Sequence, residues 1–91
     1  MTAPSAFLKA FHDLPVGTFT GSVGPHRYLV SHQIMACGKS HKLVAHQLGG
    51  PDYISLNLYL TQKSGALLRP CEMPAEKVVD FVLALAPDVQ E

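Results

Sequence analysis

The alternation in residues 53–60, YISLNLYL, constrains the fold of this chain more than any other feature of its sequence. Its even-numbered residues are all branched aliphatic, whereas its odd-numbered residues are polar or aromatic: Tyr53, Ser55, Asn57 and Tyr59. A period of two residues places these sets on opposite faces of an extended strand. The segment therefore predicts an interior strand with one buried face and one face of mixed polar and aromatic character.

Four further segments have the composition of strands. Residues 17–23 alternate in the same way, and residues 26–36 and 40–48 are rich in β-branched and aromatic side chains. Residues 66–70 are short and end in Pro70, which cannot donate to a ladder of hydrogen bonds. We therefore expect five strands, the last of them at an edge.

The two middle strands should form a hairpin around Gly38-Lys39. If these two residues make a two-residue turn, Ile34 pairs with Leu43 and Leu29 pairs with Leu48. This register is favoured because it matches apolar residues with one another.

A helix is predicted at each end of the chain. Residues 5–14 place Phe7, Phe11 and Leu14 at helical spacing, with Ser5 as the N-cap. Residues 74–87 begin and end in proline and place four apolar residues on one stripe: Val78, Phe81, Val82 and Leu85. Short connections favour antiparallel pairing of consecutive strands. We therefore predict one α+β domain over residues 1–91, an antiparallel five-stranded meander with both helices on one face.

The charge content bears on the class of partner. Only 15% of the residues are charged, and the seven basic and seven acidic residues cancel. Near-zero net charge argues against nucleic acid as a partner, because phosphate attraction supplies most of that affinity. A shortage of charge instead favours a face that another subunit covers. With neither a signal-like segment nor a membrane span, the expected location is cytoplasmic.

Cys71 and Cys37 are the candidates for thiol chemistry. Cys71 precedes the second helix, where the helix dipole and Arg69 favour a thiolate. Glu72 opposes that effect, and neither cysteine has a partner at C-x-x-C spacing. We expect two free thiols, with Cys71 a small packing residue. A thiol-dependent enzyme or redox sensor remains the alternative function.

Two other patterns are too weak to predict a site. Gly-Lys-Ser at 38–40 lacks the first glycine of a phosphate-binding loop, and a strand rather than a helix is expected after it. In the predicted register His32 faces Ala45 and His46 faces Ser31, which puts the two imidazoles on opposite sides of the sheet. We therefore expect neither a metal site nor a bound cofactor.

The polar and aromatic face of the sheet is the candidate binding surface. Its predicted members are Tyr53, Ser55, Asn57, Tyr59, Leu29, Gln33, Lys42, Val44 and His46. Such a face suits a second copy of the chain, another protein or a small ligand. The sequence thus predicts a non-catalytic binding or self-association module, most simply a homodimer. A second alternative is recognition of a nucleotide or single-stranded nucleic acid on the Tyr53/Tyr59 face, assisted by Lys42, Arg27 and Lys63.

Overall fold

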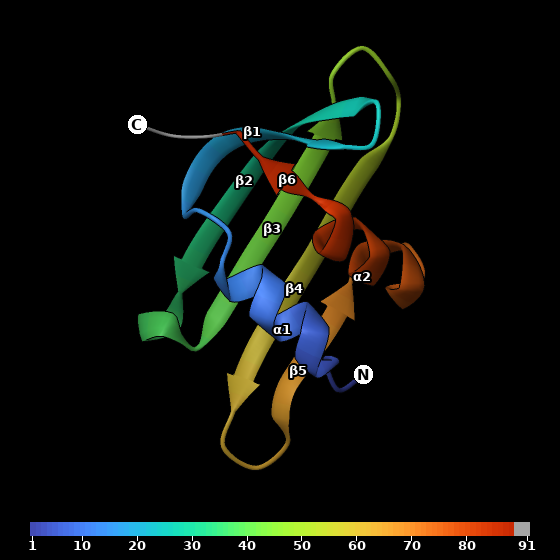
Figure 1. Cartoon of the computed structure of the whole chain (residues 1–91). Coiled ribbons are helices and arrows are strands. Elements are labelled where there is room, and N and C mark those ends of the chain that lie inside the picture. The colour runs from blue at the N-terminus through green and yellow to red at the C-terminus, as the bar shows by residue number, and fades with distance from the viewer. Residues whose placement is uncertain (89–91) are drawn as a thin grey trace.

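Six strands form one antiparallel sheet in the computed structural model, which describes residues 1–88 (Figure 1). Their order across the sheet is β5-β4-β3-β2-β1-β6. The strands are β1 (Gly17–Val23), β2 (His26–Met35), β3 (Ser40–Gln47), β4 (Tyr53–Thr61), β5 (Gly65–Pro70) and β6 (Ala86–Pro87). The alternating segment predicted as an interior strand is β4, which lies between β3 and β5. The α+β prediction is confirmed, with one strand more than expected.

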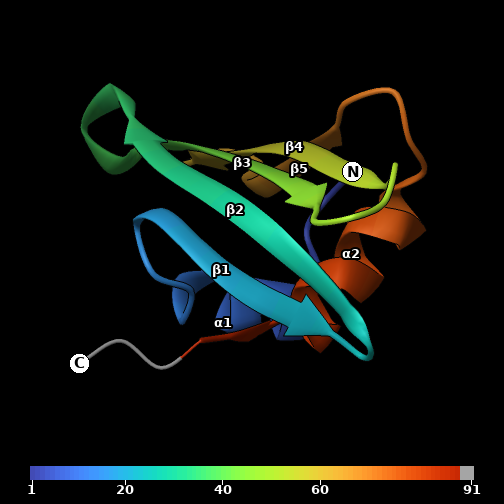
Figure 2. The ribbon, with the colours of Figure 1, turned by 90° about the horizontal axis from the view of Figure 1, so that it is seen from above.

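Both helices lie on the same side of the sheet (Figure 2). Helix α1 (Ser5–His12) follows Pro4 and helix α2 (Ala75–Ala84) follows Pro74, so an extended proline occupies the N-cap position of each. The prediction of Ser5 as an N-cap is wrong, because Ser5 is already helical and no side chain caps α1. No helix within residues 1–88 is long and apolar enough to cross a bilayer.

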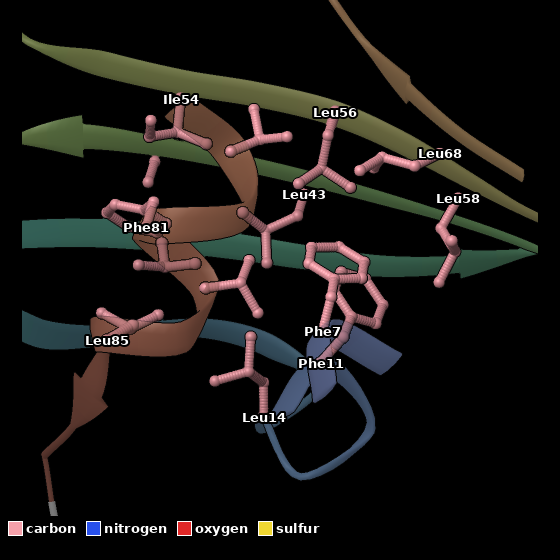
Figure 3. Close-up of a cluster of buried hydrophobic side chains, with 14 of the residues drawn as sticks. Phe7, Phe11, Leu14, Leu43, Ile54, Leu56, Leu58, Leu68, Phe81 and Leu85 are labelled. Carbon is pink, nitrogen blue, oxygen red and sulfur yellow. The ribbon is translucent and has the colours of Figure 1, made fainter. Parts of the chain in front are cut away.

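The core fills the space between the helices and the sheet (Figure 3). Phe7 and Phe11 of α1 stack on one another, with ring centroids 5.6 Å apart, and neither is exposed. The sheet supplies a layer of aliphatic side chains to meet them: Leu43, Ile54, Leu56, Leu58 and Leu68. Burying one such side chain stabilises the fold by about 1.5–3 kcal/mol. The predicted α2 stripe is buried as well, at Val78, Phe81, Val82 and Leu85.

The predicted register of the β2–β3 hairpin is wrong. Leu43 lies opposite His32 rather than Ile34, and Leu29 lies opposite His46 rather than Leu48. The cause is the turn, which has four residues, 36–39, instead of two. Each β2 residue therefore pairs with a β3 residue two positions earlier than predicted. Because side chains alternate with a period of two, every side chain keeps its predicted face.

Two short segments close the edges of the sheet. Strand β6 lies where the end of the second helix was predicted, because α2 already ends at Ala84, and it pairs with β1 through Gly21 and Ser22. At the other edge Thr2 bridges to Leu67 of β5, and the Ala3 amide donates to the Ala66 carbonyl over 2.8 Å. The helices cover one face and these segments cover both edges. The face opposite the helices is therefore the large surface of the sheet that the described chain leaves open.

Candidate functional site

The open face consists of the outward-pointing residues of β1–β5, and it contains all nine predicted binding residues. Cross-strand pairing arranges them in rows: Thr20–Leu29–His46–Tyr53, Thr18–Ser31–Val44–Ser55, Gln33–Lys42–Asn57–Arg69 and Met35–Ser40–Tyr59–Leu67. Tyr53 and Tyr59 are each 40% exposed and Leu29 is 41% exposed. A sheet face with this many apolar and aromatic groups in water is where a partner gains most by binding.

Cations gather at one end of the open face. Lys42 and Arg69 flank Asn57 in one row. Lys39 and Lys63 lie in the β2–β3 and β4–β5 turns, which reach the same end of the sheet (Figure 1). The Leu60 amide donates to the Lys39 carbonyl over 2.8 Å and holds the first of these turns against β4.

We call Lys39, Lys42, Lys63 and Arg69, together with Tyr59 between them, the basic end. All four cations are exposed. The ion pairs found within residues 1–88 involve other residues, so none of the four is neutralised by a described carboxylate. Arg69 was not among the predicted site residues, although its alternation with the buried Leu68 was a signal for its position.

The opposite end of the open face is electrically balanced. Asp88 accepts two hydrogen bonds from Arg27, at 2.8 and 2.6 Å, and a further one from the Thr20 hydroxyl. Hydrogen bonds from Arg27 and Thr20 hold the pKa of the Asp88 carboxyl far below its usual range. Arg27, predicted to assist phosphate binding, is therefore engaged within the chain.

The two cysteines are free. Cys37 is exposed in the β2–β3 turn. Cys71 is half-buried and follows β5, where its Sγ accepts a hydrogen bond of 3.4 Å from Asn57 Nδ2 on the open face. Its backbone amide donates to the Ser55 carbonyl over 3.0 Å. The thiol that was predicted to pack at the helix start thus borders the candidate binding surface.

A pair of buried histidines on the helix side was missed by the sequence reasoning. His32 Nδ1 lies 3.0 Å from the Pro15 carbonyl oxygen, which can only accept, so this nitrogen carries the proton. His32 Nε2 then accepts from His41 Nδ1, which is 2.9 Å away. His32 is on the opposite side of the sheet from His46, as predicted, but it faces Leu43 rather than Ala45. The signal that could have located the pair is the parity of positions 32 and 41 with the buried Val30 and Leu43.

Burial is the main cause that lowers the pKa of both His32 and His41 below the ordinary value. His12 of α1 lies close, with its ring centroid 5.9 Å from that of His41, and its charge lowers both pKa values further. Within residues 1–88 no group of three His, Cys, Asp or Glu side chains is arranged to hold a metal ion. The pair instead joins β2 and β3 beneath Phe11.

The Gly-Lys-Ser segment has no phosphate-loop shape in the structure. Gly38 and the two residues before it adopt left-handed conformations, and strand β3 begins at Ser40. No pocket is found in the part of the chain that the structure describes. Comparison of the chain with protein-family models, with curated proteins and with solved structures finds no match in any of the three.

Proposed function

We propose that this α+β domain is a non-catalytic binding module and that the open face is its binding surface. The observation that carries the proposal is the gathering of Tyr53, Tyr59 and Leu29, exposed, on the face that neither helices nor edge segments cover. Aromatic side chains offer a partner large contact area at small conformational cost.

The groups best suited to acid–base chemistry support the non-catalytic part of the proposal. His32 and His41 hydrogen-bond to one another beneath the sheet. Asp52 accepts from Lys77 over 2.7 Å and from the Tyr28 hydroxyl over 2.9 Å. The two histidines thus contact each other, and Asp52 contacts Lys77 and Tyr28. Neither group faces the open face, so these contacts stabilise the fold.

A screen of small aromatic and anionic fragments by nuclear magnetic resonance tests this proposal without knowledge of the natural partner. We expect the shifted amides to cluster on β3, β4 and β5 around Tyr59. Tyr59→Ala should remove these shifts, whereas Leu83→Ala, at an exposed position of α2, should leave them. Shifts that cluster on the helices, or no shifts at all, would contradict the open face as the binding surface.

Self-association is a second candidate function, favoured by the apolar members of the open face. A homodimer would remove Leu29, Val44, Tyr53 and Tyr59 from water. Its twofold symmetry would also bury Lys42, which lies on the interior strand β3 between Gln33 and Asn57 and not at the rim. An unpaired charge is costly to bury, so the second copy must supply an acceptor for it.

The oligomeric state decides between a homodimer and a different partner. Light scattering at about 100 micromolar detects affinities of about −5.5 kcal/mol or better. A homodimer on the open face predicts that Tyr59→Lys gives monomers and that Leu83→Lys does not. A monomer mass for the unaltered protein would rule out the dimer and leave the face to another ligand.

A further inference from the structure

The fold separates charges that cancel in the composition. Glu76 and Asp80 lie on α2, on the helix side of the sheet. The strand residues of the open face include no carboxylate, and Asp88, which follows β6, is already paired with Arg27. The basic end therefore presents four cations on a chain whose net charge is zero.

Building on the proposed function, we propose that the basic end binds single-stranded nucleic acid, with phosphates along its cations and a base stacked on Tyr59. Lys42 and Arg69 are two strands apart, or about 10 Å, and Lys39 and Lys63 extend the positive surface beyond the strand ends. A phosphate backbone that follows this row passes Lys42 and Arg69, and one that turns toward the strand ends reaches Lys39 or Lys63.

Tyr59 supplies the stacking platform. It stands on β4 next to the Asn57 row, and the residue is 40% exposed. Base–aromatic stacking tolerates any base, because every base has a π-face. Asn57 and Gln33 lie in the row beside it and carry amide donors and acceptors that can hydrogen-bond to an unstacked base. Tyr53 lies six residues away on the same strand, about 20 Å distant, outside the basic end.

The shape of the face favours a single strand over a duplex. Duplex sequence is read by a helix or β-ribbon that enters a groove. Helices α1 and α2 are on the other side of the sheet (Figure 2), so neither helix is available on the open face to enter a groove. A single strand, in contrast, can splay its bases onto a sheet with exposed aromatic residues.

Fluorescence anisotropy with labelled 12-nucleotide single strands, RNA and DNA separately, tests the proposal. Each cation that contacts a phosphate contributes about 0.7 to the slope of log affinity against log salt. We therefore expect a slope of up to about −3 for the unaltered protein. Lys42→Gln and Arg69→Gln should each reduce its magnitude by about 0.7. Lys9→Gln, an exposed cation on α1, should change neither slope nor affinity.

Substitution of Tyr59 distinguishes base stacking from general charge attraction, because it leaves the charge of the protein unchanged. Tyr59→Ala should weaken binding by about fivefold or more at constant salt, and Tyr59→Phe should restore it. A duplex of the same sequence should bind more weakly. Equal binding of duplex and single strand with no effect of Tyr59→Ala would overturn the proposal in favour of a general polyanion surface.

Absence of binding at 50 mM salt, or binding that no open-face variant weakens, would also overturn it. If fragments still map to the open face while oligonucleotides do not bind, the binding module stands and only this choice of ligand fails. A concentration-dependent mass that Tyr59→Lys abolishes would assign the face to a second copy instead.

Discussion

At the scale of single residues, the His32–His41 pair has the clearest physical consequence. The hydrogen bond between them requires one neutral acceptor nitrogen, His32 Nε2, while Nδ1 of His32 is committed to the Pro15 carbonyl. Protonation of His32 replaces that acceptor with a donor facing the Nδ1–H of His41. His12, the titratable group that faces the pair from α1, is itself basic. A proton taken up here therefore removes a hydrogen bond and adds a buried charge.

We predict that the protein loses stability between pH 7 and pH 5. Folding lowers the pKa of His32 and His41, so below about pH 6.5 the unfolded chain binds more protons than the folded chain. The free energy of unfolding therefore has its full value above the pKa that these histidines have in the unfolded chain. It decreases as the pH falls through that pKa toward the lower pKa of the folded state. Each pKa unit of lowering corresponds to about 1.4 kcal/mol. Urea unfolding at a series of pH values measures the slope.

His41→Gln keeps an amide donor near His32 and removes one of the titrating groups, so it should flatten this slope. His46→Gln, at an exposed position of the open face, is the matched control and should leave the slope unchanged. The prediction is restricted to pH values above 5, where the two carboxylates of Asp52 and Asp88 do not contribute to the slope. Their pKa values are lowered by their hydrogen bonds, so they remain ionised in this range. Equal stability at pH 7 and pH 5 would contradict a buried neutral pair.

At the scale of elements, period-two alternation predicted strands better than turn chemistry predicted their register. Strand β4 and the face of each of its side chains followed from the sequence, because burial leaves a two-residue period little choice. The β2–β3 turn did not, because Ala36 and Cys37 adopt left-handed conformations that favour glycine. Nothing in the local sequence indicates that these two residues adopt this conformation.

Strand β6 was missed for a related reason. Ala86 and Pro87 have no alternation to detect, and they pair with β1 only because Gly21 offers no side chain there. A Cβ atom at Gly21 would lie 2.9 Å from the Ala86 carbonyl oxygen and 3.0 Å from a methyl carbon of Leu85. The close approach of α2's end to the sheet therefore depends on this glycine.

Gly21→Ala is expected to destabilise the protein by about 1–3 kcal/mol, the range for forcing an extra methyl group into a packed site. Ser22→Ala, at the neighbouring position of β1 that pairs with Ala86, is the control and should cost less. Thermal or urea unfolding compares the two. If Gly21→Ala is as stable as the unaltered protein, β6 is held so loosely that it can move away from the added methyl group.

At the scale of the whole molecule, the sequence predicted which residues share the open face but not how charge is distributed over it. The nine predicted residues depend only on parity within strands. The charge distribution also depends on two separate turns that reach the same end of the sheet, where they form the basic end. At the opposite end it depends on Asp88, from far along the chain, which engages Arg27. The composition therefore argued against nucleic acid as a partner, whereas the arrangement of the cations on the sheet supports our proposal that the basic end binds it.

Asp88 should control the closure of the β1 edge. Its backbone amide donates to the Thr20 carbonyl over 2.9 Å, and its carboxylate binds Arg27 and Thr20. We expect Asp88→Ala to accelerate hydrogen exchange of the residue 88 amide while the Leu60 amide, at the other end of the sheet, keeps its rate. Asp80→Ala, at an exposed position of α2, should alter neither. Unchanged exchange at residue 88 would show that the backbone pairing alone holds the edge.

The closure of both edges by distant segments has a consequence for the order of folding. The hairpins β1–β2 through β4–β5 join neighbours in sequence, but Thr20 and Asp88 are 68 residues apart and Ala3 meets Ala66 from a similar distance. Long loops close late, because their entropy is lost before their contacts form. A chain with its hairpins complete and its end segments still free exposes two rows of unpaired amides and carbonyls to other copies. Refolding yield should therefore fall as the protein concentration rises.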